Sequence, residues 1–270
     1  MTDYAQPEVL VSTDWVDQHK FDHNVVLVEV DVDTTAFEEG HIPGAINIDL
    51  IQFHWIDTSK AGVREFIRQS RIILSNIGIK SDKYVIFYDN ESGMSAARGV
   101  WLLLFFSHKK VSLLDGGFDK WKRDGHTVET KTNSFVTSNF KGKPDLSVLA
   151  TADEIKKSTK KKGFKLIDAR SEEEYNGSHV RAARRGHIPT AINIDWQQNT
   201  QGKVFKTTEE LSKIYSSIPK NSQVVTYCQG GYRAAHSFVA LKMLGYKKVK
   251  MYLGSWGEWG NKVNLPVEHK

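Results

Sequence analysis

The sequence has almost no cysteine and no long hydrophobic run. Of its 270 residues only Cys228 is a cysteine, which excludes an intrachain disulfide, a cysteine-rich zinc site and a two-thiol redox centre. The longest apolar stretches, such as the one from Val100 to Phe106, are far too short to span a bilayer, and the start of the chain lacks the basic and then apolar pattern of a secretory signal. We therefore expect a cytoplasmic protein with no membrane partner, no metal and no other cofactor.

The chain also lacks a strong excess of one charge. Its 37 Lys and Arg residues oppose 32 Asp and Glu residues, which leaves a formal net charge of +5. Such an excess can attract small anions, but it falls short of the concentrated basic face of a nucleic-acid-binding protein, so we expect no nucleic-acid partner. With 40% hydrophobic and 26% charged residues, the composition is typical of a folded globular protein, and the length favours two domains.

Two segments of the chain are nearly identical. Residues 40–49 read GHIPGAINID and residues 186–195 read GHIPTAINID, so they match at nine of ten positions. Shorter similarities before and after them keep the same order, which indicates a tandem repeat. The second copy has seven additional residues upstream of its GHIP segment, within residues 172–185, and that insertion contains Arg181, Arg184 and Arg185.

Each copy alternates short β-branched runs with helical stretches, a pattern that predicts an α/β fold. The expected strands lie at 25–30, 84–88 and 111–114, and at 165–167, 223–227 and 249–253. Residues 131–144 are polar and lack periodicity, which is typical of a linker. We therefore predict a first domain at 1–130, a linker at 131–149 and a second domain at 150–270.

Cys228 opens a loop between a predicted strand and a predicted helix, with the sequence Cys-Gln-Gly-Gly-Tyr-Arg at 228–233. The backbone N–H groups of such a loop can converge on an anion, and the helix dipole and Arg233 both favour the thiolate form. A lone cysteine after an apolar strand is more often a small buried hydrophobe. However, only an anion-binding loop explains two glycines and an arginine in the next five positions. Without a second cysteine, a sulfur atom bound to Cys228 cannot be lost into an internal disulfide, which favours a persulfide carrier.

Taken together, these features resemble the tandem-domain rhodaneses, the family of thiosulfate and 3-mercaptopyruvate sulfurtransferases. The resemblance is carried by both GHIP segments, by the Cys228 loop and by residues 254–261, GSWGEWGN, which are similar to the closing signature of the family. It covers almost the whole chain and implies two tandem rhodanese-like domains, each with a central, mainly parallel sheet flanked by helices. The second domain would carry the sulfur-accepting cysteine. The first would be inactive, because Asp89 and Glu91 follow Tyr88 where the second copy has its thiol loop.

The resemblance implies a set of site residues. Cys228 would be catalytic, and the substrate would be bound by Gln229, Gly230, Gly231, Tyr232, Arg233, Arg170 and Arg185. Glu174 stands where animal members of the family have a substrate-binding arginine, so Arg181, Arg184 and Arg185 are candidate replacements, although a solvated basic patch explains them equally well. His41, His187, Trp256 and Trp259 have counterparts in the copy without a thiol, and we interpret them as scaffold and core.

The predicted activity is transfer of sulfane sulfur from thiosulfate to cyanide or another thiophilic acceptor, through a Cys228 persulfide. The partners would be a small anionic sulfur donor and an acceptor such as cyanide, a thiol or a thioredoxin-like protein. Arg233 and Glu174 favour thiosulfate over 3-mercaptopyruvate, which is the alternative donor. A cysteine-dependent phosphatase and a non-catalytic sulfur-binding or interaction module are the alternatives from other classes. Four residues separate Cys228 from Arg233, whereas tyrosine phosphatase loops resemble Cys, five residues and Arg. This loop is therefore tighter, suited to a sulfane sulfur and too small for a phosphoryl group, so we expect no phosphatase activity.

Overall fold

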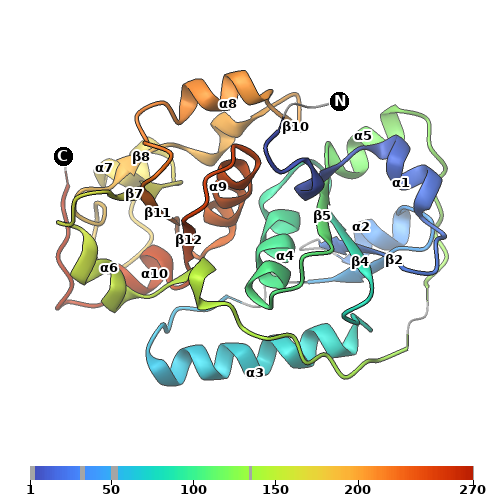
Figure 1. The fold of residues 1–270 in the computed structure, drawn as a ribbon, viewed down its shortest axis with the longest axis horizontal. Helices are drawn as coiled ribbons and strands as arrows, with labels where there is room; N and C mark the ends of the chain where they lie inside the picture. The colour runs from blue at the N-terminus through green and yellow to red at the C-terminus, as the bar shows by residue number, and fades with distance from the viewer. Residues whose placement is uncertain (1–3, 31–33, 50–53, 134–135, 270) are drawn as a thin grey trace.

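The computed structural model describes residues 4–30, 34–49, 54–133 and 136–269, which form two α/β domains side by side (Figure 1). Each domain contains a five-stranded parallel sheet, and the two sheets have the same strand order. The first sheet runs β1 (Leu10–Val11), β5 (Val111–Leu114), β4 (Tyr84–Tyr88), β2 (Val25–Val30) and β3 (Ile46–Ile48). The second runs β6 (Leu149–Ala150), β12 (Val249–Tyr252), β11 (Gln223–Tyr227), β7 (Phe164–Asp168) and β8 (Ile192–Asn193).

Helices cover the faces of both sheets. Those of the first domain are α1 (Thr13–His19), α2 (Thr34–Glu39), α3 (Lys60–Asn76), α4 (Met94–Phe105) and α5 (Gly117–Arg123). Those of the second are α6 (Ala152–Ser158), α7 (Glu172–Asn176), α8 (Thr208–Ile214), α9 (Tyr232–Met243) and α10 (Ser255–Trp259). The described residues also form three 3-10 turns (Pro7–Val9, Leu146–Val148 and Trp196–Asn199) and a small antiparallel pair, β9 (Thr200–Gln201) with β10 (Val204–Phe205).

The predicted α/β fold with parallel sheets is confirmed, and its strands lie where the β-branched runs indicate them. The boundaries at 130 and 150 stay predictions. Between the two sheets the chain packs against the first domain: Phe140 is buried against Phe106, and Asp145 N–H donates to the carbonyl of Phe105 at 2.6 Å. The second sheet begins with β6 at Leu149.

The two histidines of the GHIP segments have equivalent structural roles. Both are buried, and their Nδ1 atoms lie 2.7 Å from the carbonyl of Phe37 in the case of His41 and 2.8 Å from that of Tyr175 in the case of His187. Each also pairs through its backbone with the last segment of its own domain, at Glu129 and at Glu268 respectively. The pairing fixes the end of each domain against its GHIP turn, as expected for scaffold residues.

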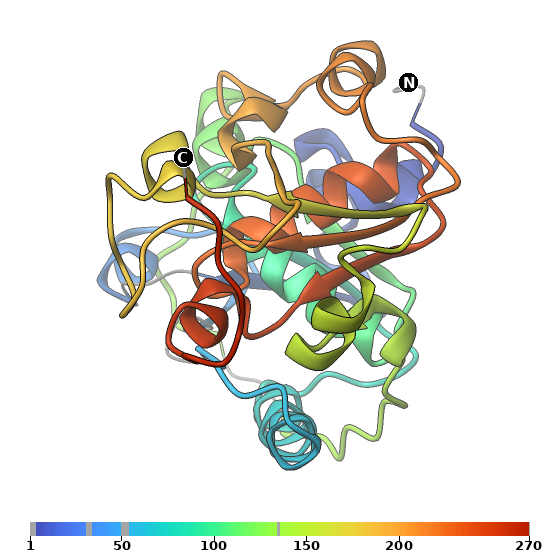
Figure 2. The same cartoon turned by 90° about the vertical axis from the view of Figure 1, so that its left-hand side faces the viewer.

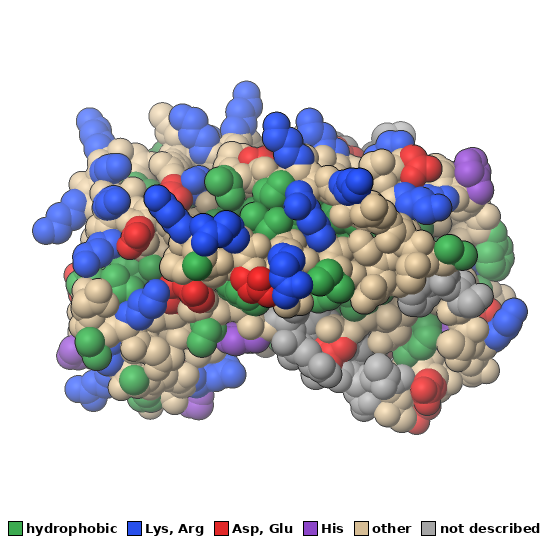
Figure 3. Space-filling model, turned by 90° about the horizontal axis from the view of Figure 1, so that it is seen from below, with side chains coloured by type: hydrophobic (Ala, Val, Ile, Leu, Met, Phe, Trp, Pro, Cys, Tyr) green, Lys and Arg blue, Asp and Glu red, His purple; other side chains and the backbone are tan. Residues whose placement is uncertain are grey.

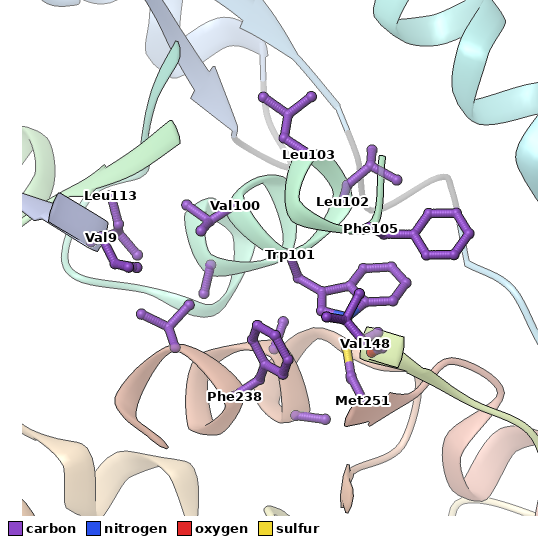
Figure 4. Close-up of a cluster of buried hydrophobic side chains, with 14 of the residues drawn as sticks. Val9, Val100, Trp101, Leu102, Leu103, Phe105, Leu113, Val148, Phe238 and Met251 are labelled. Carbon is purple, nitrogen blue, oxygen red and sulfur yellow. The ribbon is translucent and has the colours of Figure 1, made fainter. Parts of the chain in front are cut away.

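The two domains share a hydrophobic cluster, centred on the contact between α4 and α9 (Figure 4), and each domain also has a smaller cluster of its own. Trp101 and Val100 of α4 lie against Phe238 of α9 and Met251 of β12, and the Trp101 indole N–H donates to the carbonyl of Val148 at 3.1 Å. In Figure 2, which looks onto the second domain, α9 and the second sheet lie in front of α4. Because apolar side chains of both domains are buried in one cluster, the relative position of the domains is fixed by packing.

The surface seen from below carries many lysines and arginines around hydrophobic patches (Figure 3). A groove of 820 Å³ between α3 and α6 is lined in part by Lys60, Arg64, Lys157 and Lys250. This groove contains no thiol. In the part of the chain that the structure describes, none of the helices combines the length and the apolar character needed to cross a membrane.

Candidate active site

Cys228 lies directly after β11, in a turn that leads into α9. The thiol is almost fully buried, with 1% of the residue exposed, and its Sγ accepts a hydrogen bond of 3.1 Å from the Gly231 N–H. Gly231 has φ of +93°, a conformation that favours glycine, and precedes the first residue of α9. The turn therefore aims a backbone donor and the start of a twelve-residue helix at the sulfur.

The segment that begins α10 holds this turn in place from behind. The N–H groups of Trp256 and Gly257 donate to the carbonyls of Cys228 and Gln229, at 2.9 and 2.8 Å. Ser255, which has φ of +51°, accepts a hydrogen bond from Cys228 N–H at 3.2 Å through its Oγ. These contacts engage two carbonyls of the turn and the Cys228 N–H, so the segment at the start of α10 fixes the backbone on both sides of the thiol residue.

The thiol lines a cavity of 370 Å³ between the two domains. His54 and Met94 of the first domain face residues of the second domain across it. The second domain contributes Arg181, Cys228, Gln229, Gly230, Tyr232 and Arg233. Hollows of 1000 and 840 Å³ beside residues 137–143 are larger, but neither is lined by the thiol. We therefore assign the active site to the smaller cavity, because it contains the nucleophile.

Arg233 is paired with Glu174 at the edge of the cavity. Its two terminal nitrogens donate to the two carboxylate oxygens of Glu174, at 2.5 and 2.9 Å. Burial opposes the positive charge of Arg233. The pairing with Glu174 and the proximity of Cys228 outweigh this effect, so the pKa of Arg233 is raised above its ordinary value. Burial likewise opposes the charge of Glu174, yet Arg233 lowers the pKa of that carboxyl. The cation expected to face sulfur is therefore partly neutralised.

The profile of the rhodanese-like domain matches residues 12–124 and again residues 151–262 of this chain. The chain belongs to the rhodanese family. The sulfur carrier protein TtuD of Thermus thermophilus is 38% identical to this rhodanese over 98% of each chain. A Mycobacterium leprae protein, provisionally named as a thiosulfate sulfurtransferase, is 38% identical over 98% of this chain and 99% of its own.

A solved structure supports the same class. SseA from Escherichia coli, described as a 3-mercaptopyruvate sulfotransferase, is 26% identical and has a TM-score of 0.80, with 92% of this rhodanese and 98% of SseA covered. The tandem rhodanese-like domains expected from the sequence are thereby confirmed, and the chain is a sulfurtransferase at the level of class. Its donor is a separate question.

The structure does not bring all the predicted substrate residues of this rhodanese into the cavity. Arg170 is buried beside it: its guanidinium forms a 2.6 Å ion pair with Asp168, donates to the carbonyl of Gly186 at 2.9 Å and lies 4.7 Å from the Trp256 ring. Arg170 therefore supports the segment that holds the Cys228 turn and does not line the cavity.

The three arginines of the insertion have different environments. Arg181 is exposed, lines the cavity and lies 3.8 Å from Glu174. Arg184 donates to backbone carbonyls of the C-terminal segment, at Trp259, Gly260, Lys262 and Leu265. Arg185 is exposed and does not line the cavity. Of the three, the geometry supports Arg181 as the candidate replacement for the missing family arginine.

Sequence reasoning missed His54 and Ser255. His54 is far from the loop in sequence, but a Cβ atom built on Gly230 would lie only 2.0 Å from its Cε1 atom, so the ring packs directly on the loop. Burial, with Arg98 and Arg181 nearby, lowers the pKa of His54. Ser255 could have been found from the repeat, because it stands where the first copy has Gly117. The structure shows that both residues have a similar positive φ, +51° for Ser255 and +57° for Gly117.

The first domain contains an equivalent turn in which a carboxylate takes the position of the thiol. Phe118 N–H donates to the carbonyl of Asp89 at 2.8 Å, as Trp256 N–H does to that of Cys228, so Asp89 and Cys228 correspond. The Asp89 side chain accepts from the N–H groups of Glu91, Gly93 and Ala96, at 3.3, 3.0 and 3.1 Å. Burial raises the pKa of Asp89 to about 7. The turn is thus filled by its own acid and has no thiol.

Among the residues that the structure describes, no three histidine, cysteine, aspartate or glutamate side chains are grouped so that they could hold a metal ion. The chemistry that the described site supports is nucleophilic attack by a thiolate that accepts a hydrogen bond from the Gly231 N–H.

Proposed function

We propose that this rhodanese transfers the outer sulfur of thiosulfate to cyanide or another thiophilic acceptor through a persulfide on Cys228. The observation that carries the proposal is the environment of one atom. Cys228 Sγ lines a cavity between the domains, accepts a hydrogen bond from Gly231 N–H and lies at the start of α9. This environment suits a sulfur anion.

The reaction has two displacement steps. The Cys228 thiolate attacks the outer sulfur of thiosulfate, the S–S bond of the donor breaks, and its electron pair leaves with sulfite. The terminal sulfur of the resulting persulfide is then attacked by cyanide, which leaves as thiocyanate, and the electron pair of the broken S–S bond restores the Cys228 thiolate. Neither step needs a net proton transfer or an external oxidant. Backbone N–H groups of the turn would stabilise the charge on sulfur throughout.

One contact favours thiosulfate over 3-mercaptopyruvate. Glu174 presents a carboxylate that is already paired with Arg233, so a keto acid finds a negative group where the family commonly grips its carboxylate with arginine.

The relatives support the two halves of the proposal separately. The name of the Mycobacterium leprae protein proposes thiosulfate as donor, and that of TtuD describes a sulfur carrier. SseA keeps mercaptopyruvate as the alternative donor. Gln229 and Tyr232 would line the path of the donor, and Arg181 would attract it, because its guanidinium is the exposed cation of the cavity lining.

The test combines intact mass with kinetics. Incubation with thiosulfate should add the mass of one sulfur atom, and cyanide should remove it, whereas Cys228→Ser should show neither change and no transfer. The variant should keep the wild-type far-UV spectrum and nearly the same Tm, because serine preserves the shape of the side chain. Values of kcat/KM should be higher for thiosulfate than for 3-mercaptopyruvate.

Each opposing outcome points to a different function. A preference for mercaptopyruvate would overturn the donor assignment and leave the persulfide mechanism. A mass that never changes would support a non-catalytic module, and hydrolysis of an aryl phosphate that depends on Cys228 would support a phosphatase.

A further inference from the structure

The first domain places a buried arginine behind the Cys228 turn. Arg98, on α4, has 3% of its surface exposed, and its guanidinium lies 4.6 Å from the ring of Trp101 and 5.4 Å from the ring of Tyr232 in the second domain. A Cβ atom built on Gly231 would lie 3.0 Å from Arg98 Nη1. The guanidinium therefore packs on the residue whose N–H binds the sulfur of Cys228.

This cation has no carboxylate partner in the described part of the chain. Its Nη1 atom contacts the sulfur of Met251 at 3.5 Å, and its Nη2 atom is buried without a hydrogen bond. The acidic groups that act on it electrostatically are the phenol of Tyr232 and the thiol of Cys228. Burial raises the pKa of Tyr232 to about 12, so the phenol is neutral near pH 7. Of these two groups, Cys228 is then the one that can carry a negative charge, and the Asp49 carboxylate acts electrostatically on the Tyr232 phenol.

The inactive turn shows the opposite arrangement. Arg98 and His236 are each the fifth residue of the helix that follows a turn, α4 and α9, and each reaches into the other domain. His236 donates from Nε2 to the carbonyl of Ser92 at 2.8 Å, and burial lowers its pKa to about 4. The first turn thus contains its own carboxylate, Asp89, and faces a neutral ring. The second turn contains no fixed anion and faces a guanidinium.

We infer that Arg98 is a positioning residue for the transferred sulfur: it supplies, from the domain without a thiol, the positive charge that balances the thiolate and persulfide of Cys228. The inference rests on the proposed function of Cys228. An unpaired buried cation is costly, and an anion on the neighbouring sulfur removes that cost, so the charge favours the loaded protein.

Other charges around the thiol do not replace this one. Arg233 is compensated by Glu174, and Arg181 lies at the exposed edge of the cavity. His54 also faces this region, but its pKa is lowered, which favours the neutral ring. Of the cations that the described residues place around Cys228, Arg98 combines burial with the absence of a paired carboxylate.

The experiment measures alkylation of Cys228 by iodoacetamide in the sulfur-free full chain, at pH 7 and at pH 9.5. Arg98→Met removes the charge but keeps an unbranched side chain, Arg98→Lys keeps the charge, and Arg98→Gln is a second neutral variant in case the first does not fold. Arg71→Met is the matched control, because Arg71 also lies near an aromatic ring, that of Phe106, away from the cavity.

Removal of the charge should slow alkylation about tenfold at pH 7 and much less at pH 9.5, where hydroxide ionises the thiol without help. Arg98→Lys should restore most of the rate at pH 7, and Arg71→Met should behave as the wild type. Equal rates in the wild type and both neutral variants would overturn the inference, as would a loss of the same size at both pH values, which indicates altered access. Alkylation uses no sulfur donor, so a wild type that thiosulfate fails to load would refute the proposed function without deciding the role of Arg98.

Discussion

Arg233 donates hydrogen bonds from two nitrogens to the two carboxylate oxygens of Glu174, beside the thiol of Cys228. The pair joins the start of α9 to α7, the short helix at the start of the insertion that distinguishes the second copy. Glu174 also accepts a hydrogen bond from Ser171 N–H and so closes the first turn of α7. One carboxylate therefore shapes the cavity and reduces the positive charge that a donor meets there.

Replacement of Glu174 by glutamine tests this balance. Glu174→Gln keeps a hydrogen-bonding side chain but frees the charge of Arg233, so we expect the KM for thiosulfate to fall about fivefold, an effect of ~1 kcal/mol. The KM for mercaptopyruvate should fall as well, because a repelling carboxylate is lost. Glu173→Gln, on the exposed side of the same helix, is the control and should change neither value. Steady-state kinetics at constant ionic strength measure both, and a higher KM for thiosulfate in Glu174→Gln would refute the argument.

The contact between Gly230 and His54 predicts a rescue. Gly230→Ser introduces a Cβ atom 2.0 Å from the present position of His54 Cε1, so the ring or the turn must shift, and kcat/KM for thiosulfate should fall about tenfold. Adding His54→Ala opens the space for the serine. The kcat/KM of the double variant should therefore be close to that of His54→Ala alone. If the single variant is as active as the wild type, the His54 ring moves freely and does not shape the cavity.

Arg184 and Arg185 should differ although they are neighbours in sequence. Arg184 donates to four backbone carbonyls of the C-terminal segment, so Arg184→Met should lower the Tm by about 5 °C, the effect of ~2 kcal/mol in a chain of this size. Arg185→Met should leave the Tm and the KM for thiosulfate unchanged, because the side chain is exposed away from the cavity. Thermal unfolding and kinetics on both variants test this, and a raised KM in Arg185→Met would restore its predicted role in substrate binding.

His236 should make the domain contact sensitive to acid. Burial lowers the pKa of His236 to about 4, below its ordinary value of 6.5, so the unfolded chain binds its proton first as the pH falls. Stability from the neutral ring is therefore present above pH 6.5 and lost towards pH 4, with ~2 kcal/mol lost between pH 7 and pH 5.

The matched variant for this prediction is His236→Gln, which can still donate to Ser92 and does not titrate. Urea unfolding measures the free energy of unfolding of both proteins at pH 7 and pH 5. The decrease from pH 7 to pH 5 should be larger in the wild type than in His236→Gln by about 2 kcal/mol. Asp89, whose pKa is raised to about 7, acts in the opposite direction, but it contributes equally to both proteins and cancels in the comparison. The same pH dependence in both proteins would show that His236 does not titrate in this range.

The sequence was sufficient for features that depend on neighbouring residues. The β-branched run at 84–88 predicts β4 because local periodicity determines a buried strand, and the glycines after Cys228 predict a turn because only certain backbone angles close it. The position of His54 could not be predicted in this way. It depends on how two domains dock, and docking is decided by the side chains that pack between α4 and α9. Likewise, two adjacent arginines look alike in sequence, and only the carbonyls of the C-terminal segment distinguish Arg184 from Arg185.

The contact between α4 and α9 has a consequence for how the chain is made. The ribosome completes α4 long before α9, so the newly made first domain presents Trp101 and the apolar residues around it to water and to other chains. Chaperones that bind exposed apolar surfaces would recognise this intermediate until the rest of the polypeptide emerges and covers it. The half of the protein without a thiol thus keeps an apolar surface uncovered until its partner is made, and the half with the thiol packs on a surface that is already formed.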